Sequence, residues 1–202
     1  MHRQFPRRLL GLALGLGLLA LVAELAGALA NRQAAAAGEA LLAAQPEPAL
    51  RRATRALGLS PYHEQAQYTQ LVALKRLGRW RELGEAARRA APWHPNRGGI
   101  VQLQAETAWN LGRSAEAAPA IEELLWLTPL PLHNTVPAWR LATLAGRAVW
   151  GDRDPRVRAA AVRTLTLLDA DPTLGAADRE AARRDAAAAL RAAGAPLAAQ
   201  AR

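Results

Sequence analysis

The chain of 202 residues contains no cysteine, and several other chemically active residue types are scarce. Without cysteine it forms no disulfide, no cysteine-ligated zinc site, no iron–sulfur cluster and no lipoprotein-type acyl anchor. Its two serines, Ser60 and Ser114, lie outside the Gly-x-Ser-x-Gly context of a nucleophilic hydrolase. Glu122 and Glu123 are adjacent, so on a helix they point about 100° apart and cannot share one substrate bond. These absences predict that the protein is not an enzyme.

Lysine and aromatic residues are also rare. Lys75 is the one lysine against 25 arginines, and the formal net charge is +9. The arginines are dispersed in small groups, and aromatics make up only 4% of the chain. Nucleic-acid binding needs cations on one face with stacking aromatics, so we expect no nucleic-acid partner. The cations more simply form a solvated face or one that attracts anionic lipid headgroups.

The N-terminal thirty residues differ from the remainder of the chain. Residues 9–30 are apolar except for Glu24, and they follow a basic start that contains Arg3, Arg7 and Arg8. A run of 22 residues is long enough to span roughly 30 Å of hydrocarbon. The basic flank keeps the N-terminus in the cytoplasm, so the chain from Asn31 onward is expected to be exported.

Two interpretations of residues 1–30 remain open. An uncleaved helix over residues 9–30 predicts a single-pass protein of the bacterial inner membrane with a periplasmic domain. The sequence Ala28-Leu29-Ala30 also fits an A-x-A cleavage site. A cleaved signal peptide would give a secreted or periplasmic protein that begins at Asn31.

A period of 34 residues organises the rest of the chain. It relates three Gly-Arg pairs, at 78–79, 112–113 and 146–147, and three prolines, Pro61, Pro95 and Pro129. A glycine favours a left-handed helix cap, and a proline cannot continue a helix. The period therefore predicts helix hairpins in which Gly78, Gly112 and Gly146 each end a first helix. Pro119 is expected to delay or kink the second helix of its hairpin.

This pattern resembles the tetratricopeptide repeat (TPR) family, whose unit has 34 residues, a glycine between helices A and B, and a proline near its end. The matching units are about 30–63, 64–97, 98–131 and a degenerate 132–165. The first is also degenerate, because Ala44 stands where the turn glycine belongs. The resemblance implies an all-α solenoid of antiparallel helix hairpins over residues 31–150, preceded by the hydrophobic helix. Residues 151–202 are expected to form a C-terminal helical cap and a frayed tail.

Metal and cofactor sites are not indicated. His63, His94 and His133 lie in the loops between repeats, and equivalent positions of stacked repeats are about 8–10 Å apart or more. That spacing is too wide for one ion. Gly98-Gly99 lacks the Lys-Ser/Thr of a phosphate-binding loop. We predict no metal and no cofactor.

The resemblance implies a scaffold that binds a protein partner in a groove lined by the A helices. The groove positions, carried over by phase, are Gln65, Tyr68, Lys75, Arg76, Gln102, Glu106, Trp109, Asn110 and Arg140. Amides can satisfy a peptide backbone, and aromatics bury area at low entropy cost. The predicted function is an adaptor that assists assembly of a membrane or periplasmic complex. The alternative is a periplasmic, chaperone-like subunit that presents apocytochrome during cytochrome c maturation.

Overall fold

The computed structural model describes residues 5–95, 97–127, 132–171 and 173–194, in which α-helix is the only regular secondary structure. The all-α prediction is therefore confirmed. Pro129 and the tail after Gly194 lie outside the described residues. The chain divides into two compact units, Met1–Arg79 and Trp80–Arg202. The boundary falls at the turn inside the predicted 64–97 repeat.

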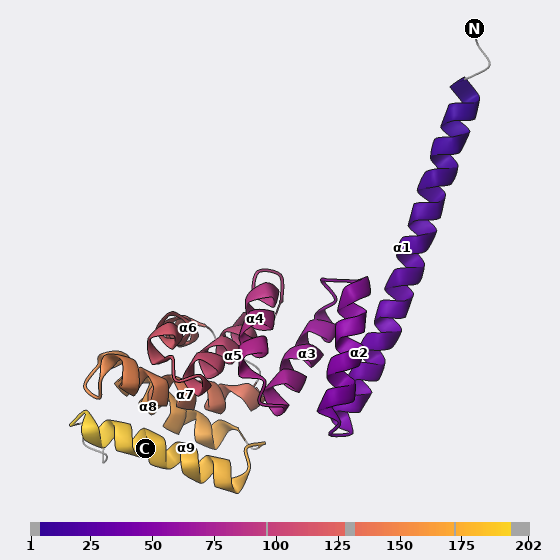
Figure 1. Ribbon diagram of the computed structural model, residues 1–202. Helices are drawn as coiled ribbons and strands as arrows, with labels where there is room; N and C mark the ends of the chain where they lie inside the picture. The colour runs from indigo at the N-terminus through magenta and orange to yellow at the C-terminus, as the bar shows by residue number, and fades with distance from the viewer. Residues whose placement is uncertain (1–4, 96, 128–131, 172, 195–202) are drawn as a thin grey trace. The chain divides into compact units, whose positions relative to one another are not determined.

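Within the described residues, the first unit contains three helices and the second contains six (Figure 1). In the first unit the helices are α1 (Phe5–Leu42), α2 (Pro46–Leu59) and α3 (Glu64–Arg76). In the second they are α4 (Trp80–Ala90), α5 (Arg97–Asn110), α6 (Ser114–Trp126), α7 (Leu132–Trp150), α8 (Pro155–Ala170) and α9 (Ala176–Ala192). Successive helices pack on one another within each unit, and α7 also packs on α9.

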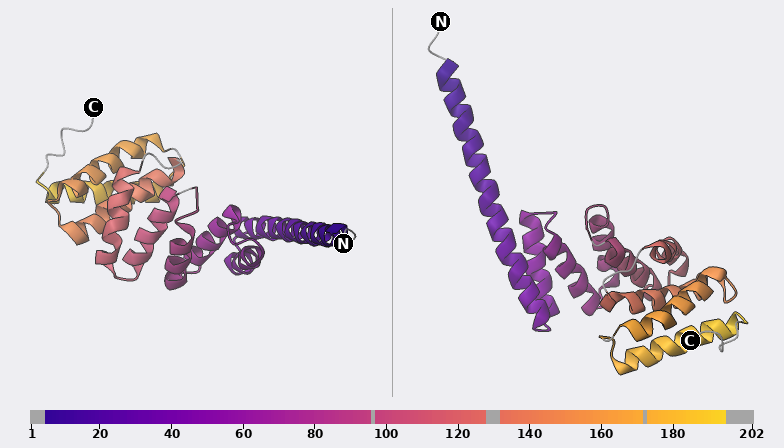
Figure 2. Two further views of the ribbon diagram at one scale, coloured as in Figure 1. Left: turned by 90° about the horizontal axis from the view of Figure 1, so that it is seen from above. Right: turned by 180° about the vertical axis from the view of Figure 1, so that it is seen from behind.

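Helix α1 has two different halves. In its N-terminal half the large apolar side chains from Leu12 to Leu29 are 47–67% exposed. In its C-terminal half Ala30, Ala34 and Ala37 are fully buried. Helix α2 lies along this second half only (Figure 2, right). Within Leu12–Leu42 an 18-residue window reaches a mean hydropathy of 2.2, and the stretch is long and apolar enough to cross a membrane.

Small residues hold the first unit together. The buried alanines of α1 recur every three or four residues, so they form one stripe along the helix. They meet an equivalent stripe on α2, and Ala34 packs with Ala56 and with Ala66 of α3. Alanine side chains let helix backbones approach closely, so packing in this unit depends on small volume rather than on bulky apolar residues.

The turns of the first three repeats share one hydrogen-bond pattern. At each turn the N–H of the left-handed residue donates to the carbonyl three residues earlier, and the next N–H donates to the carbonyl five residues earlier. The left-handed residues are Ala44 (φ 56°), Gly78 (φ 66°) and Gly112 (φ 69°). This is a Schellman-type cap, and it satisfies carbonyls that the helix end would leave unpaired. The prediction for Gly78 and Gly112 is confirmed, and the degenerate first repeat keeps the same turn.

Ala44 adopts the left-handed conformation at a steric cost, because its Cβ crowds the backbone there. We expect Ala44→Gly to raise the free energy of unfolding by about 0.5–1 kcal/mol. Thermal unfolding of the full chain in detergent, followed by circular dichroism, measures the effect. The control is Ala35→Gly, an exposed position inside α1, which should instead cost about 1 kcal/mol. A destabilised Ala44→Gly variant would contradict the strain argument.

The prediction for Gly146 is wrong. Helix α7 continues through Gly146 and ends at Trp150, and the next left-handed residue is Gly151 (φ 89°). Gly146 is instead a packing residue, because a Cβ there would lie 3.1 Å from the Trp150 ring and 3.2 Å from Val157 Cγ2. The glycine keeps its periodic position, but its role is the close approach of a side chain and not a turn.

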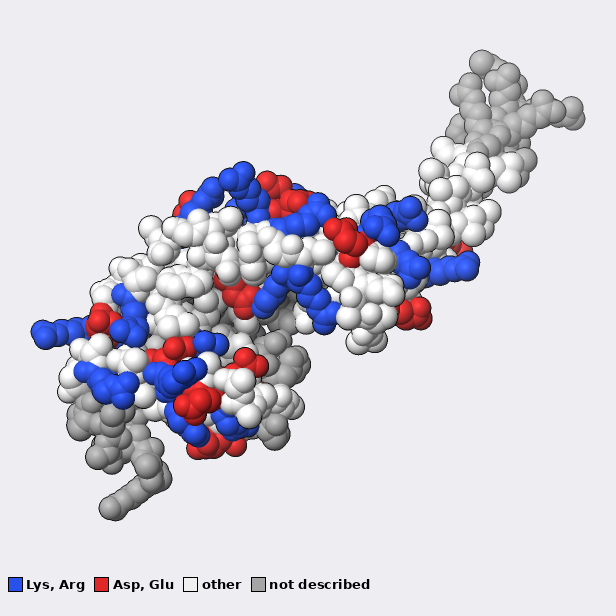
Figure 3. All heavy atoms as spheres, turned by 60° about the horizontal axis from the view of Figure 1, so that its bottom comes forward, with Lys and Arg blue, Asp and Glu red and all other residues white. Residues whose placement is uncertain are grey.

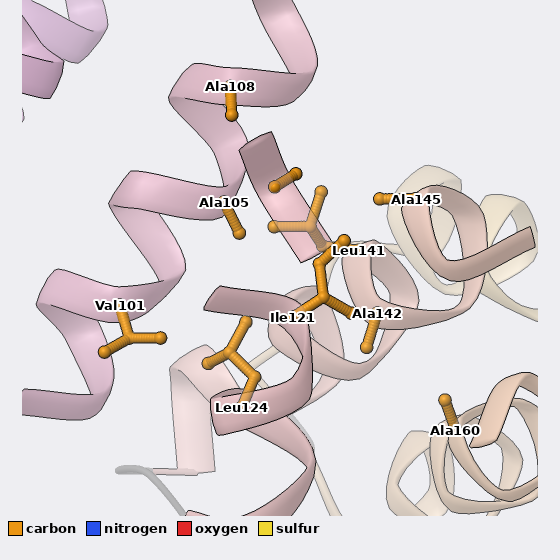
Figure 4. Packing of buried hydrophobic residues seen from close by; sticks show 10 residues of the cluster. Val101, Ala105, Ala108, Ile121, Leu124, Leu141, Ala142, Ala145 and Ala160 are labelled. Carbon is orange, nitrogen blue, oxygen red and sulfur yellow. The ribbon is translucent and has the colours of Figure 1, made fainter. Parts of the chain in front are cut away.

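The core of the second unit joins four helices. Figure 4 shows Val101 and Ala105 of α5 facing Ile121 and Leu124 of α6. The same cluster includes Leu141, Ala142 and Ala145 of α7 and Ala160 of α8. Helix α6 contains Pro119 yet begins at Ser114, so the proline does not delay it. Helix α8 begins at Pro155, with Asp154 as its N-cap.

Candidate partner-binding surface

The predicted groove residues of α3 lie at the surface of the first unit. Gln65, Lys75 and Arg76 are exposed, and the Tyr68 side chain is 40% exposed. Tyr68 and Lys75 are seven residues apart, so they share one face of the helix. Arg76 is partly engaged within the unit, because its Nη1 donates to the Leu41 carbonyl oxygen at 2.7 Å.

The predicted groove residues of α5 interact mainly along their own helix. Gln102 is buried, and its Nε2 donates to Glu106 Oε1 at 3.0 Å. Asn110 is exposed, and its Nδ2 donates to the Glu106 carbonyl oxygen at 2.8 Å. Trp109 is partly buried against the four-helix core. The expectation that Gln102 contacts a partner at the surface is therefore corrected.

Helix α9 engages Arg140, the last predicted groove residue. Its Nε lies 2.6 Å from Asp185 Oδ2 of α9, and both side chains are about two-thirds buried (35% and 27% exposed). Val136, one turn earlier on α7, packs with Leu168 and Ala182. Residues of α8 and α9 therefore cover the face of α7 on which a groove was predicted: Leu168 and Ala182 pack on Val136, and Asp185 pairs with Arg140. Binding of a partner by the predicted groove residues remains a prediction. Most of the exposed residues among them lie on α3.

A cleft that the sequence did not indicate lies between α4, α5 and α6. Its volume is about 380 Å³. Its floor includes small side chains, and Gly84 lets α4 approach Thr107, whose Cγ2 would be 3.0 Å from a Cβ at that position. Gly84 inside a predicted helix was the signal that could have revealed this close approach.

Both signs of charge line this cleft. Arg81 and Arg88 come from α4, and three glutamates from α4 and α6 lie among the lining residues. Glu123 binds Arg97 at 2.6 Å, and that hydrogen bond raises the pKa of the Arg97 guanidinium. Figure 3 likewise shows cationic and anionic side chains side by side rather than one large patch of a single sign. The mixture suits a polypeptide better than a polyanion.

A second charged cluster closes the turn between α7 and α8. The Arg156 guanidinium stacks on the Trp150 ring, 3.9 Å from its centroid. It also donates to both carboxylate oxygens of Asp154 at 3.0 Å. These hydrogen bonds lower the pKa of Asp154, although partial burial opposes the effect. Asp154 in turn accepts a hydrogen bond from the Arg156 backbone N–H at 2.8 Å and caps α8.

The lowered pKa of Asp154 predicts a pH effect. The folded pKa lies below the unfolded value of about 3.9, so the stabilisation is present above that pH and is lost as the pH falls through the folded pKa. We expect Asp154→Asn to melt earlier than the native chain at pH 7, and the difference to disappear towards pH 2. The control is Asp169→Asn. The Asp169 side chain is 84% exposed, and its ion pair with Arg183 is long, at 4.0 Å, so removing its charge should have little effect. An Asp154→Asn deficit that persists at pH 2 would contradict this account.

His63 supports the turn before α3, whereas His133, which was expected in a loop, lies in α7. His63 Nδ1 accepts a hydrogen bond from the Ala66 backbone N–H at 3.4 Å and caps α3, while its Nε2 lies 2.8 Å from Asn31 Oδ1. His94 is buried at the end of α4. Within the described part of the chain, no three His, Cys, Asp or Glu residues are grouped as metal ligands would be.

Paired antiparallel helices, Schellman turns spaced by 34 residues and a long apolar first helix define the class: the chain has an all-α, TPR-like repeat fold. Among solved structures it is similar to the MamA RS-1 ArsTM double mutant, and MamA is a TPR-repeat protein. The TM-score is 0.57 and the identity 16%, over 80% of this chain and 94% of that one. No family model and no curated protein matches the sequence. The likeness shows the fold alone.

Proposed function

We propose that this protein is a non-enzymatic scaffold of the bacterial cell envelope, tethered to the inner membrane by α1, that holds a protein partner on its repeats. The partner-binding part of the proposal rests on one observation, the exposed face of α3. Gln65, Tyr68 and Lys75 present an amide, an aromatic ring and a cation along one repeat helix. An aromatic ring flanked by polar groups is the combination that anchors a peptide at a protein surface.

The continuity of α1 supports the proposed membrane tether. Its exposed apolar half continues without a break into the helix that packs on α2. Ala30, at the predicted cleavage position, is fully buried inside a helix. Cleavage after Ala30 would remove this buried residue from the packed part of α1, so its burial supports the uncleaved anchor over the cleaved signal peptide.

The test is affinity purification from detergent-solubilised membranes, with partners identified by mass spectrometry. We expect Tyr68→Ala to lose a partner that the native chain captures, a change of about tenfold or more in recovery, because removing an anchor residue costs about 2 kcal/mol of binding. Its melting temperature should fall only slightly, because Tyr68 is 40% exposed and its truncation removes only part of a buried contact. Tyr62→Ala is the matched control: it is also an exposed tyrosine, but it lies off the α3 face, and it should keep the partner. Equal recovery with Tyr68→Ala would contradict binding through α3.

A further inference from the structure

We infer that the connection between α2 and α3 rests on the bilayer surface at the point where α1 leaves the membrane, with Tyr62 and Leu59 in the interfacial layer. This connection, residues 59–63, is called the surface loop below. The inference rests on the proposed membrane tether and adds a second contact with lipid. It concerns the first unit alone.

The antiparallel course of α2 brings the surface loop back beside the apolar run. Arg52 Nη1 donates to the Ala36 carbonyl oxygen at 2.8 Å, which fixes the middle of α2 against α1. One end of the loop is held by His63, whose Nε2 lies 2.8 Å from Asn31 Oδ1. Asn31 is the first residue after the apolar run of residues 9–30. Figure 1 shows the loop on the side from which the exposed half of α1 projects.

The length of α1 sets the level of the loop relative to the lipid. From Leu12 to Ala30 the helix rises about 27 Å, which nearly matches the hydrocarbon thickness of about 30 Å. When that run fills the hydrocarbon, Asn31 emerges into the headgroup layer. The surface loop is hydrogen-bonded to Asn31, so it lies in the same layer.

The side chains there suit that layer. Tyr62 is 69% exposed and Leu59 is 39% exposed. Tyrosine is enriched at membrane interfaces because its ring is apolar and its hydroxyl is polar. Arg32 follows Asn31, and Arg55 lies one turn before Leu59; both are exposed. Cations at this level attract lipid phosphates. In Figure 3 most of the described apolar part of α1 is white, and charged side chains gather where it meets the remainder of the first unit.

The absence of native cysteine makes a depth measurement direct. The full chain is reconstituted in phosphatidylethanolamine–phosphatidylglycerol vesicles with one nitroxide label at a time, on Leu18→Cys, Tyr62→Cys or Leu42→Cys. Collision rates with oxygen, which favours lipid, and with a nickel chelate, which favours water, report the depth of each label. Leu18 tests the tether, Tyr62 tests the surface loop, and Leu42 is the control.

The control is well matched because Leu42 is 90% exposed and lies at the opposite end of the α1–α2 hairpin. It is about 17 Å beyond Asn31 along α1. We expect oxygen access to dominate at Leu18, nickel access to dominate at Leu42, and a marked loss of nickel access at Tyr62 relative to Leu42. Leu59→Cys repeats the loop measurement from the end of α2, and circular dichroism verifies the helical content of each variant.

The possible failures are distinct. A lipid-buried label at Leu18 combined with a label at Tyr62 as open to nickel as that at Leu42 overturns the inference and leaves the tether standing. A water-exposed label at Leu18 overturns the tether and, with it, the surface loop.

Discussion

Replacing Trp109 by alanine is expected to lower the free energy of unfolding by about 3 kcal/mol. Trp109 packs against the cluster formed by α5, α6, α7 and α8, so truncation removes contacts from the main core of the second unit. The indole is only partly buried, which places the expected loss at the lower end of the range for tryptophan truncations. Thermal or urea unfolding, followed by circular dichroism, measures the loss.

Trp126→Ala provides the control for this experiment. Trp126 ends α6 and is 84% exposed, so its truncation should alter the free energy of unfolding by less than about 0.5 kcal/mol. A Trp109→Ala variant that melts like the native chain but loses its partner would show that Trp109 is a binding anchor. That result would restore the groove over α5 that was predicted from the repeat phase.

Gly146→Leu is expected to cost about 3 kcal/mol, at the upper end for overpacking. A Cβ at this position already lies 3.1 Å from the Trp150 ring, and the remaining leucine atoms would have to displace that ring or the fully buried Val157. Displacing Trp150 would also disturb the cation–π contact with Arg156. The melting temperature of the variant measures this cost.

The control is Gly58→Leu in α2, where nothing lies within 4 Å of a new Cβ. Leucine favours helix more than glycine does, so this variant should be as stable as the native chain or slightly more stable. A Gly146→Leu variant that is equally stable would show that the Trp150 ring moves aside without loss, and it would contradict the packing role of Gly146.

The turns could be predicted from the sequence because they depend on local backbone geometry. A left-handed residue followed by the same two hydrogen bonds occurs at Gly78 and Gly112, where the period indicated it. The same turn at Ala44 escaped the residue pattern, because an alanine can adopt it when the surrounding helices hold the chain there. Gly146 had the expected residue at the expected position, but its environment is set by Trp150 and Val157, and the repeat pattern contains no information on that contact.

The candidate site was less predictable because it depends on distant segments. Phase along the A helices pointed to positions on α3 that are accessible in the structure, such as Gln65 and Tyr68, and binding there stays a prediction. It could not indicate that α9 would bring Asp185 onto Arg140, 45 residues earlier in the chain. The cleft of α4, α5 and α6 was missed for the same reason, since its lining comes from three helices and shares no motif.

The unbroken α1 helix limits the reach of the proposed scaffold. No flexible linker separates the apolar run from the first hairpin, and α3 begins beside Asn31 and ends where Arg76 binds the Leu41 carbonyl. Helix α3 has 13 residues, so its exposed face extends only about 20 Å outward from the level of Asn31. In this proposal, any ligand held on α3 lies within about 20 Å of the headgroup layer, so the bilayer itself forms one boundary of the binding surface.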